Sequence, residues 1–145
     1  MARRILVGFV FSFLLMGELL GQAHAARLIV TIKGTRSADG YLYVALFSQP
    51  EGFPDGDYSA RHLKLKAAAE MLTVVFDDLA PGIYAVGTYH DENNNGRLDT
   101  NLIGYPTEGY ALSNGIRAVI SRPRFIDAAF PVGGDDAHVT LRIKY

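Results

Sequence analysis

Hydrophobic and polar residues alternate along several short stretches of this chain. In residues 27–33 the apolar side chains Leu28, Val30 and Ile32 occupy every second position, and Ile29, Thr31 and Lys33 lie on the other face. A period of two is typical of a β-strand that buries one face. The pattern predicts further strands at residues 41–47, 62–66, 71–77, 84–90 and 138–144, and shorter extended pieces at 110–112 and 125–130.

Segments rich in turn-forming residues separate these predicted strands. Residues 34–40, 49–58 and 131–136 contain Gly, Pro, Ser and Asp at positions where a strand has to stop. Residues 67–70 have helical composition, but a single turn cannot nucleate a helix unaided. About seven short strands, with no convincing helix after residue 25, predict an all-β fold, an antiparallel sandwich in one domain over residues 26–145.

One turn, residues 76–84 with the sequence FDDLAPGIY, has a more specific pattern. Leu79 is placed to plug the end of the core, Pro81 fixes φ, and Gly82 accepts the positive φ of a type II turn before Tyr84. The pattern FxxLxPGxY resembles a turn of transthyretin-like, carboxypeptidase-regulatory-like and pilin-type β-sandwich domains. The resemblance implies an immunoglobulin/transthyretin-like sandwich.

The first 25 residues have the features of a secretory signal peptide. Arg3 and Arg4 precede an apolar run at residues 5–16, and the small residues around Ala23 and Ala25 form a cleavage site. The run is shorter than the about 20 residues that cross a bilayer, so no membrane span is expected. We expect a periplasmic or secreted protein, exported by the general or the twin-arginine route.

Composition and charge narrow the classes of function. The sequence has no cysteine, which removes disulfides, a lipid-anchoring cysteine and thiolate metal sites. Cleavage of the signal peptide takes Arg3, Arg4 and Glu18 out of the 14 basic and 15 acidic residues, which leaves a net charge of −2. This balance argues against nucleic acid or an anionic membrane as the partner.

The segment HDENNNGRLD, residues 90–99, is the strongest candidate for chemistry. It follows the DxNxNGxxD spacing of the first nine positions of an EF-hand calcium loop, in which oxygen ligands alternate and a glycine makes the bend. The expected calcium ligands are the side chains of Asp91, Asn93, Asn95 and Asp99 and the carbonyl of Arg97.

The twelfth position of this loop departs from the calcium pattern, because Leu102 stands where a bidentate glutamate belongs. The missing ligands would come from Asn101, Glu108, Asp127 or water, and the affinity would be modest, on the order of 10⁻⁴ to 10⁻³ M. The alternative is a hydrogen-bonded turn without metal, since Asn95-Gly96 is a strong turn signal by itself.

Other side chains have more than one interpretation. Tyr105 and Tyr110 follow glycines and either form an aromatic binding surface for a glycan or an envelope protein, or pack their loop onto the sheet. His90 is a metal ligand, a base or a hydrogen-bonding strand end. An arginine group either holds an anion or forms a solvated basic loop; its members are Arg117, Arg122 and Arg124.

A wider resemblance covers nearly the whole predicted domain. Five segments carry it: EGFP at 51–54, LAPGIYAV at 79–86, HDENNNGRLDTN at 90–101, IGYPTEGYALSN at 103–114 and FIDAAF at 125–130. Together they resemble a bacterial family of small exported proteins catalogued as a domain of unknown function. The resemblance implies a secreted β-sandwich and no assigned activity. The sequence Arg122-Pro123-Arg124 before Phe125 is more basic than the family pattern.

Signatures of common enzymes do not occur in the chain. There is no GxSxG elbow, no HExxH helix and no cysteine nucleophile. The chain ends in LRIKY, whereas transthyretin-like hydrolases end in a Tyr-Arg-Gly-Ser motif. The sequence therefore favours a non-enzymatic binding or structural module. The alternatives are an envelope hydrolase that uses the acidic cluster, and an assembly module that pairs through an edge strand.

Overall fold

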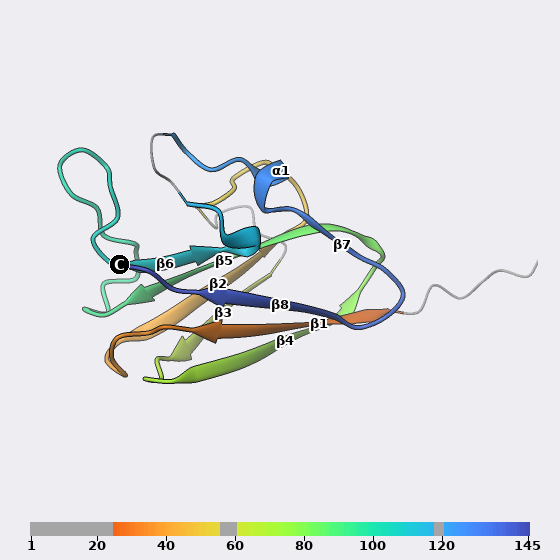
Figure 1. The fold of residues 1–145 in the computed structure, drawn as a ribbon, viewed down its shortest axis with the longest axis horizontal. Helices are drawn as coiled ribbons and strands as arrows, with labels where there is room; N and C mark the ends of the chain where they lie inside the picture. The colour runs from red at the N-terminus through yellow and green to blue at the C-terminus, as the bar shows by residue number, and fades with distance from the viewer. Residues whose placement is uncertain (1–24, 56–60, 118–120) are drawn as a thin grey trace, which may run out of the picture.

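The computed structural model describes residues 25–55, 61–117 and 121–145. The predicted signal peptide lies almost entirely in residues 1–24, outside this part of the chain. Every segment with clear alternation forms a strand, and the described residues contain two sheets and very little helix (Figure 1). The prediction of an all-β protein is confirmed.

The strands divide into a three-stranded and a five-stranded sheet. The three-stranded sheet has the order β4-β1-β8, from Met71–Leu79, Ala26–Lys33 and Ala137–Arg142. The five-stranded sheet has the order β3-β2-β5-β6, and β7 pairs with β5. Its strands are β3 Arg61–Lys66, β2 Tyr41–Phe47, β5 Gly82–Asp91, β6 Gly109–Leu112 and β7 Phe130–Val132.

The inward positions of both sheets form one hydrophobic core. The predicted inward residues Leu28, Val30 and Ile32 of β1 are at most 1% exposed, and Leu42 and Val44 of β2 are fully buried in the same cluster. Full burial of such a side chain contributes about 1.5–3 kcal/mol to folding. The alternation in the sequence thus specifies which face of each strand packs against the opposite sheet.

The pairing is not antiparallel throughout, contrary to expectation. Strands β1 and β8 are parallel neighbours, with Leu28 opposite Ala137 and Lys33 opposite Arg142. Parallel strands cannot be joined by a tight turn and need a long connection between them. Here nearly the whole domain forms that connection, so no local sequence signal marks the pair.

Two local predictions are also wrong. Residues 125–130 are not one extended piece, because α1 (Phe125–Ala128) precedes β7, with the Ala128 carbonyl accepting a 2.6 Å bond from the Ser113 hydroxyl. Gly82 does not have a positive φ; that conformation falls on Asp78, with φ 56°. Gly82 instead opens strand β5, where an added Cβ would lie 3.3 Å from the Tyr84 ring.

A second, smaller core covers one end of the outer face of the five-stranded sheet. It combines Phe47 and Ala85 of the sheet with Phe53, Leu112 and Ala128. The loop after β2 and helix α1 supply the covering residues, and Phe53 packs edge-on against Phe47 with 5.0 Å between ring centroids. The rest of this outer face is left to the loop that follows β5.

Candidate functional site

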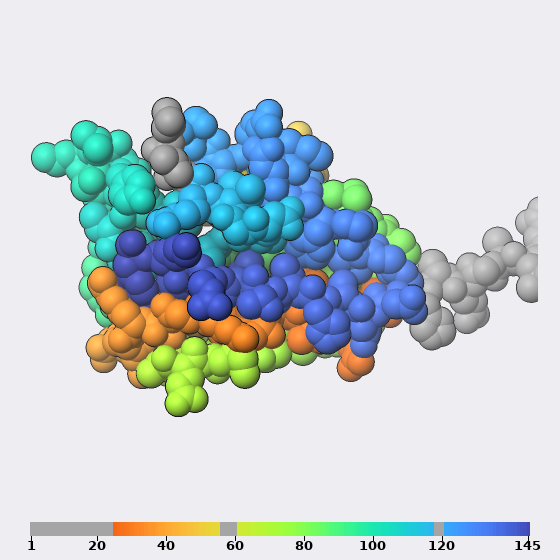
Figure 2. Space-filling view, in the orientation of Figure 1, coloured from red at the N-terminus to blue at the C-terminus, as the bar shows by residue number. Residues whose placement is uncertain are grey.

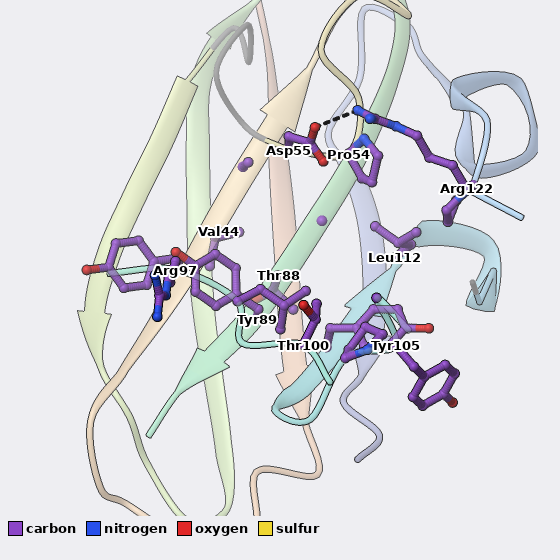
Figure 3. A pocket seen from close by; sticks show the side chains of 18 of the residues that line it. Val44, Pro54, Asp55, Thr88, Tyr89, Arg97, Thr100, Tyr105, Leu112 and Arg122 are labelled. Atoms are coloured by element: carbon purple, nitrogen blue, oxygen red, sulfur yellow. Dashed lines mark hydrogen bonds and ion pairs between the residues drawn. The ribbon is translucent and has the colours of Figure 1, made fainter. Parts of the chain in front are cut away.

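A large groove crosses the outer face of the five-stranded sheet. It has a volume of about 1,070 Å³ and lies between the loop after β5 and the segments around Pro54 and Arg122 (Figure 3). Its floor consists of outward positions of two paired strands, in which Tyr43 lies opposite Tyr89 and Ala45 opposite Gly87. The strand register therefore places two aromatic and two small residues side by side at the centre of the groove.

The small residues keep the floor flat. A Cβ added to Gly87 would lie 3.1 Å from Leu112 Cδ2, so the adjacent β6 side chain already fills that space. Pro54, Tyr105 and Pro106 line the sides. A flat apolar floor between raised walls is typical of sites that take up part of a ligand's surface.

Two stacked tyrosines form the aromatic part of the floor. The rings of Tyr43 and Tyr89 are 4.9 Å apart and nearly parallel, with an interplanar angle of 1°. The Lys64 amino group lies 5.0 Å from the Tyr43 centroid. The Tyr89 hydroxyl donates to the Gly96 carbonyl at 3.2 Å, and burial raises the pKa of Tyr89 to about 12, so the phenol stays neutral.

These two tyrosines were not among the site residues predicted from the sequence. Their alternation with buried residues assigns them to the outer face, but residues 96–106 and 121–123, far away in the sequence, turn that face into a groove. Aromatic residues at outward positions of neighbouring strands are the signal that would have found them.

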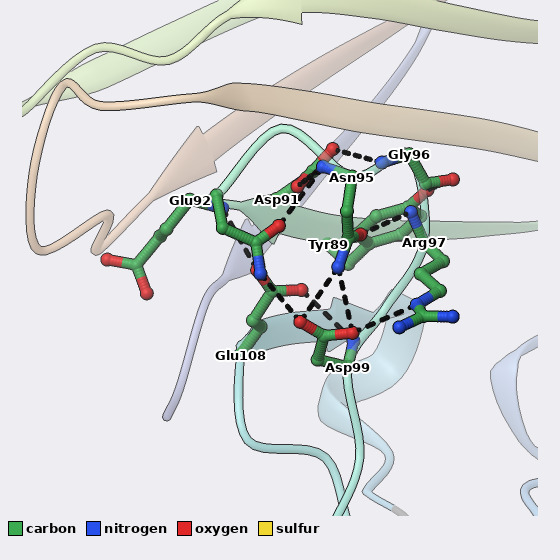
Figure 4. A network of polar contacts seen from close by, with 9 residues as sticks. Tyr89, Asp91, Glu92, Asn95, Gly96, Arg97, Asp99 and Glu108 are labelled. Atoms are coloured by element: carbon green, nitrogen blue, oxygen red, sulfur yellow. Dashed lines mark hydrogen bonds and ion pairs between the residues drawn. The ribbon is translucent and has the colours of Figure 1, made fainter.

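The predicted calcium loop is built around the buried carboxylate of Asp91. Its side chain is fully buried at the end of β5, and its two oxygens accept backbone N–H bonds from Asn95 at 3.0 Å and Gly96 at 2.8 Å (Figure 4). Gly96 has φ +82°, which a residue with a side chain rarely adopts. The carboxylate thus fixes the bend of the loop by backbone contacts.

Asp99 closes the loop from the opposite side. It accepts hydrogen bonds from the amide nitrogens of Asn95, at 3.0 and 2.9 Å, and of Asn93, at 2.7 Å, and one from Arg97 Nε at 3.1 Å. These donors, with those of Asn95 the largest contribution, hold the pKa of Asp99 below its ordinary value of 3.8. Its negative charge is stabilised by side chains of its own loop.

Glu108 ties both halves of the loop together. It is 6% exposed, and its two oxygens accept backbone N–H bonds from Glu92 and Asp99, each at 3.1 Å. The loop after β5 is therefore held at three points, by Asp91, Asp99 and Glu108, each of which accepts at least two hydrogen bonds. The wall of the groove is a fixed structure rather than a loose connection.

The suggested additional ligands lie in different places. Glu108 belongs to the loop network. The side-chain oxygen of Asn101 accepts hydrogen bonds from the N–H groups of Ile103 and Tyr105. Asp127, on α1, binds the side chain of Arg124, the residue that precedes this helix. Within the described ranges, no group of three or more His, Cys, Asp or Glu side chains is arranged to hold a metal ion. The side-chain oxygens of the motif do share one loop, but amide nitrogens face Asp99.

The two tyrosines predicted as a binding surface differ in exposure. Both line the groove, but Tyr105 is 39% exposed, whereas Tyr110 is 8% exposed and its backbone pairs with Lys144. Between them in the chain, Leu102 and Ile103 are 106% and 88% exposed at the tip of a short hairpin held by the Asn101 side chain. The hairpin borders the groove.

His90 and two of the arginines have structural partners. His90 is fully buried, with Nδ1 2.6 Å from the Tyr145 hydroxyl and Nε2 2.7 Å from the Asp39 carbonyl. The Asp39 carbonyl can only accept, so Nε2 carries the proton of the neutral imidazole, and the Tyr145 hydroxyl, which also accepts the Arg36 N–H, donates to Nδ1. Arg122 binds Asp55, and Arg124 binds Asp127.

The described residues thus define an all-β protein with two sheets and a groove on the outer face of the larger one. Residues 30–140 match the model of the family described as an uncharacterized protein conserved in bacteria, DUF2141, and the chain belongs to this family. Comparison with curated proteins and with solved structures found no match. No helix among the described residues is long and apolar enough to cross a membrane.

Proposed function

We propose that the protein is a non-catalytic binding protein whose ligand occupies the groove over Tyr43, Ala45, Gly87 and Tyr89. The observation that carries the proposal is the groove itself, a hollow of about 1,070 Å³ with a tyrosine stack in its floor and a rigid wall. A preformed, largely apolar concavity with a few polar groups is the usual form of a binding site.

The lining favours an extended peptide segment of an envelope protein over a glycan. Apolar and aromatic side chains dominate the floor, and prolines stand on both sides. Tyrosine-lined grooves suit extended peptides, whose apolar side chains fill them. A glycan needs a dense set of hydrogen-bond partners, but the carboxylates of Asp91, Asp99 and Glu108 do not line the groove, and that of Asp55, which does, is paired with Arg122.

The same arrangement gives no support to a hydrolase. An acid-base pair has to face the bound substrate within hydrogen-bonding reach. The oxygens of the acidic cluster instead accept backbone and amide N–H groups of their own loop. No specific observation favours an enzymatic role.

Export and a single sandwich domain are part of the proposal. The features of residues 1–25 support cleavage before Ala26 and release into the periplasm or the medium. An immunoglobulin/transthyretin-like sandwich over residues 26–145 is supported by the core shared between the sheets. It is also supported by the 2.9 Å bond from the Tyr84 hydroxyl to the Ala80 carbonyl, a tyrosine-corner contact.

Calcium binding by the loop of residues 91–99 is also part of the proposal. The motif supports it, because Asp91, Asn93, Asn95 and Asp99 bring their side chains to one turn. A cation has to replace the amide and guanidinium donors at Asp99, which supports a weak affinity, on the order of 10⁻⁴ to 10⁻³ M. Calcium would act by further stabilising a groove wall that hydrogen bonds already hold in place.

The peptide proposal is tested by screening the protein against a random peptide array and a glycan array. Ala45→Phe places a ring in the floor, and Thr31→Phe places the same ring on the outer face of the three-stranded sheet. We expect peptides that bind the unchanged protein and Thr31→Phe, with binding lost in Ala45→Phe. Binding to glycans alone, or equal peptide binding to both variants, would overturn the proposal.

A further inference from the structure

A second hollow shares Tyr110 and Leu112 of β6 with the groove. Its volume is about 240 Å³, and it lies between β6, the residues after η1 (Ser113–Gly115) and the end of the chain. Three cations line it, Arg117, Arg142 and Lys144, and no acidic residue of the described ranges does. All three are exposed. In Figure 2 the cyan segment around η1 lies against the dark blue end of the chain on the visible face.

The fold brings these cations together from two segments. Thr140, Arg142 and Lys144 occupy alternate positions along the last strand and its extension, and the residues between them, Leu141 and Ile143, are buried. Their side chains therefore share the outward side of the strand. Arg117 comes from the other direction, after the 3₁₀ turn that contacts β8.

These cations differ from the other arginines that have partners. Arg27, Arg36, Arg97, Arg122 and Arg124 each form an ion pair with an aspartate or glutamate. In the described part of the chain, no hydrogen bond or ion pair joins the side chains of Arg117, Arg142 or Lys144 to a carboxylate. Three like charges around one hollow repel one another, and a bound anion relieves that repulsion.

Backbone geometry adds a donor to the pocket. The N–H and carbonyl of Tyr110 bond Lys144, on the side of β6 that faces away from β5. Hydrogen-bonding direction alternates along an antiparallel strand, so the N–H of Leu112 points to the same side as that of Tyr110. Leu112 lines the hollow, as does Thr140 with its hydroxyl. The pocket thus combines charged and neutral donors.

We propose that this pocket binds a phosphate group that carries two negative charges. The planar guanidinium group matches two phosphate oxygens at once, and two guanidinium groups with one ammonium exceed the charge of a single carboxylate. Inorganic phosphate and a phosphomonoester carry about −1.5 to −2 at pH 7, whereas the diester of a phospholipid carries one charge. The ligand is therefore a free phosphate or a small phosphomonoester.

Titration of the protein followed by amide NMR shifts tests this assignment. Inorganic phosphate and glycerol phosphate are compared with acetate and with phosphatidylglycerol vesicles at constant ionic strength. We expect saturable shifts at Leu112, Arg117 and Thr140 with both phosphates. Arg117→Gln and Arg142→Gln each weaken binding about tenfold, because a charge-assisted bond is lost. The charge-matched control Lys66→Gln, on the exposed edge of β3, leaves the affinity unchanged.

Four results would overturn the proposal. One is a non-saturating response, and another is equal weakening by Lys66→Gln, since both indicate general charge screening. Acetate binding as tightly as phosphate would remove the preference for two charges. Binding to phosphatidylglycerol vesicles without binding to either small phosphate would mean that the pocket recognises a membrane surface instead of a free phosphate.

Discussion

The two polar regions of this molecule handle charge in opposite ways. In the loop of residues 91–99 the carboxylates of Asp91 and Asp99 each accept several hydrogen bonds from their own loop, including two backbone bonds at Asp91. Around the smaller hollow, Arg117, Arg142 and Lys144 meet no carboxylate within the described residues. A satisfied network stabilises the fold and binds a ligand only weakly, because the ligand has to displace bonds that are already made, whereas an unsatisfied cluster leaves binding free energy available. The comparison predicts stability effects in the first region and binding effects in the second.

The largest effect is expected for Asp91→Ala. The change empties a fully buried position, removes the acceptor of the Gly96 N–H and takes away one of the two acceptors of the Asn95 N–H, so the free energy of unfolding falls by about 2–4 kcal/mol. Urea unfolding measures the loss. Asp135→Ala, at an exposed position, and Arg142→Gln should stay within about 0.5 kcal/mol of the parent. A comparable loss in Arg142→Gln would break the comparison.

Calcium should raise stability if the loop accepts it as a ligand. At a concentration a hundredfold above its Kd, calcium adds about 2.7 kcal/mol to the free energy of unfolding. Thermal melts with calcium and with a chelator measure the difference, and magnesium is the matched control. The gain should vanish in Asp91→Asn/Asp99→Asn. An equal gain in that double variant, or no gain in the parent, contradicts the calcium proposal.

A substitution at Thr88 should give a smaller change, a gain in the free energy of unfolding. Thr88 is 4% exposed, and its hydroxyl is the buried side-chain polar atom that lacks a hydrogen-bond partner among the described residues. It lies opposite Val44 on the core face, so Thr88→Val should raise the free energy of unfolding by about 1 kcal/mol. Chemical unfolding checks this gain. A loss of stability would mean that the hydroxyl is satisfied in solution.

The smallest effect concerns the acid side of the stability curve. The pKa of Asp99 is below its ordinary value in the folded protein, so its contribution is present above the unfolded pKa of about 3.9 and is lost as the pH falls through the folded pKa. Asp99→Asn should therefore lower stability at pH 7, and the difference from the parent should shrink in more acidic solution. Unfolding curves of the parent and of Asp99→Asn, recorded at pH 7 and in acidic solution, measure this difference. A difference that is independent of pH would exclude the charge of Asp99 as its cause.

The alternation of side chains predicted the strands and their buried faces because burial acts residue by residue along each strand. Val30, Leu42 and Leu141 are all fully buried, as their positions indicated. The alternation did not predict which strands pair, since β1 and β8 come from opposite ends of the domain. A period of two states that a residue faces inward, and it carries no information on which strand lies next to it.

The candidate sites were predictable only in part, for the same physical reason. Spacing located the loop of Asp91 and Asp99, but it could not show that amide nitrogens, rather than oxygens, face Asp99, because asparagine presents both. Arg117 stands in sequence near Arg122 and Arg124, which the fold pairs with Asp55 and Asp127. The partners of Arg117 in the second hollow come from the last strand, and only the fold brings them together.

The parallel neighbours β1 and β8 also constrain the order in which the molecule can form. Strand β1, at the centre of the smaller sheet, pairs with β4 on one side. Its other side can pair only after residues 137–142 have been made. A contact between such distant segments closes a long loop, which slows folding more than it reduces stability. Until the end of the chain arrives, one edge of β1 remains unpaired and open to other strands. Chains truncated before β8 should therefore aggregate rather than fold.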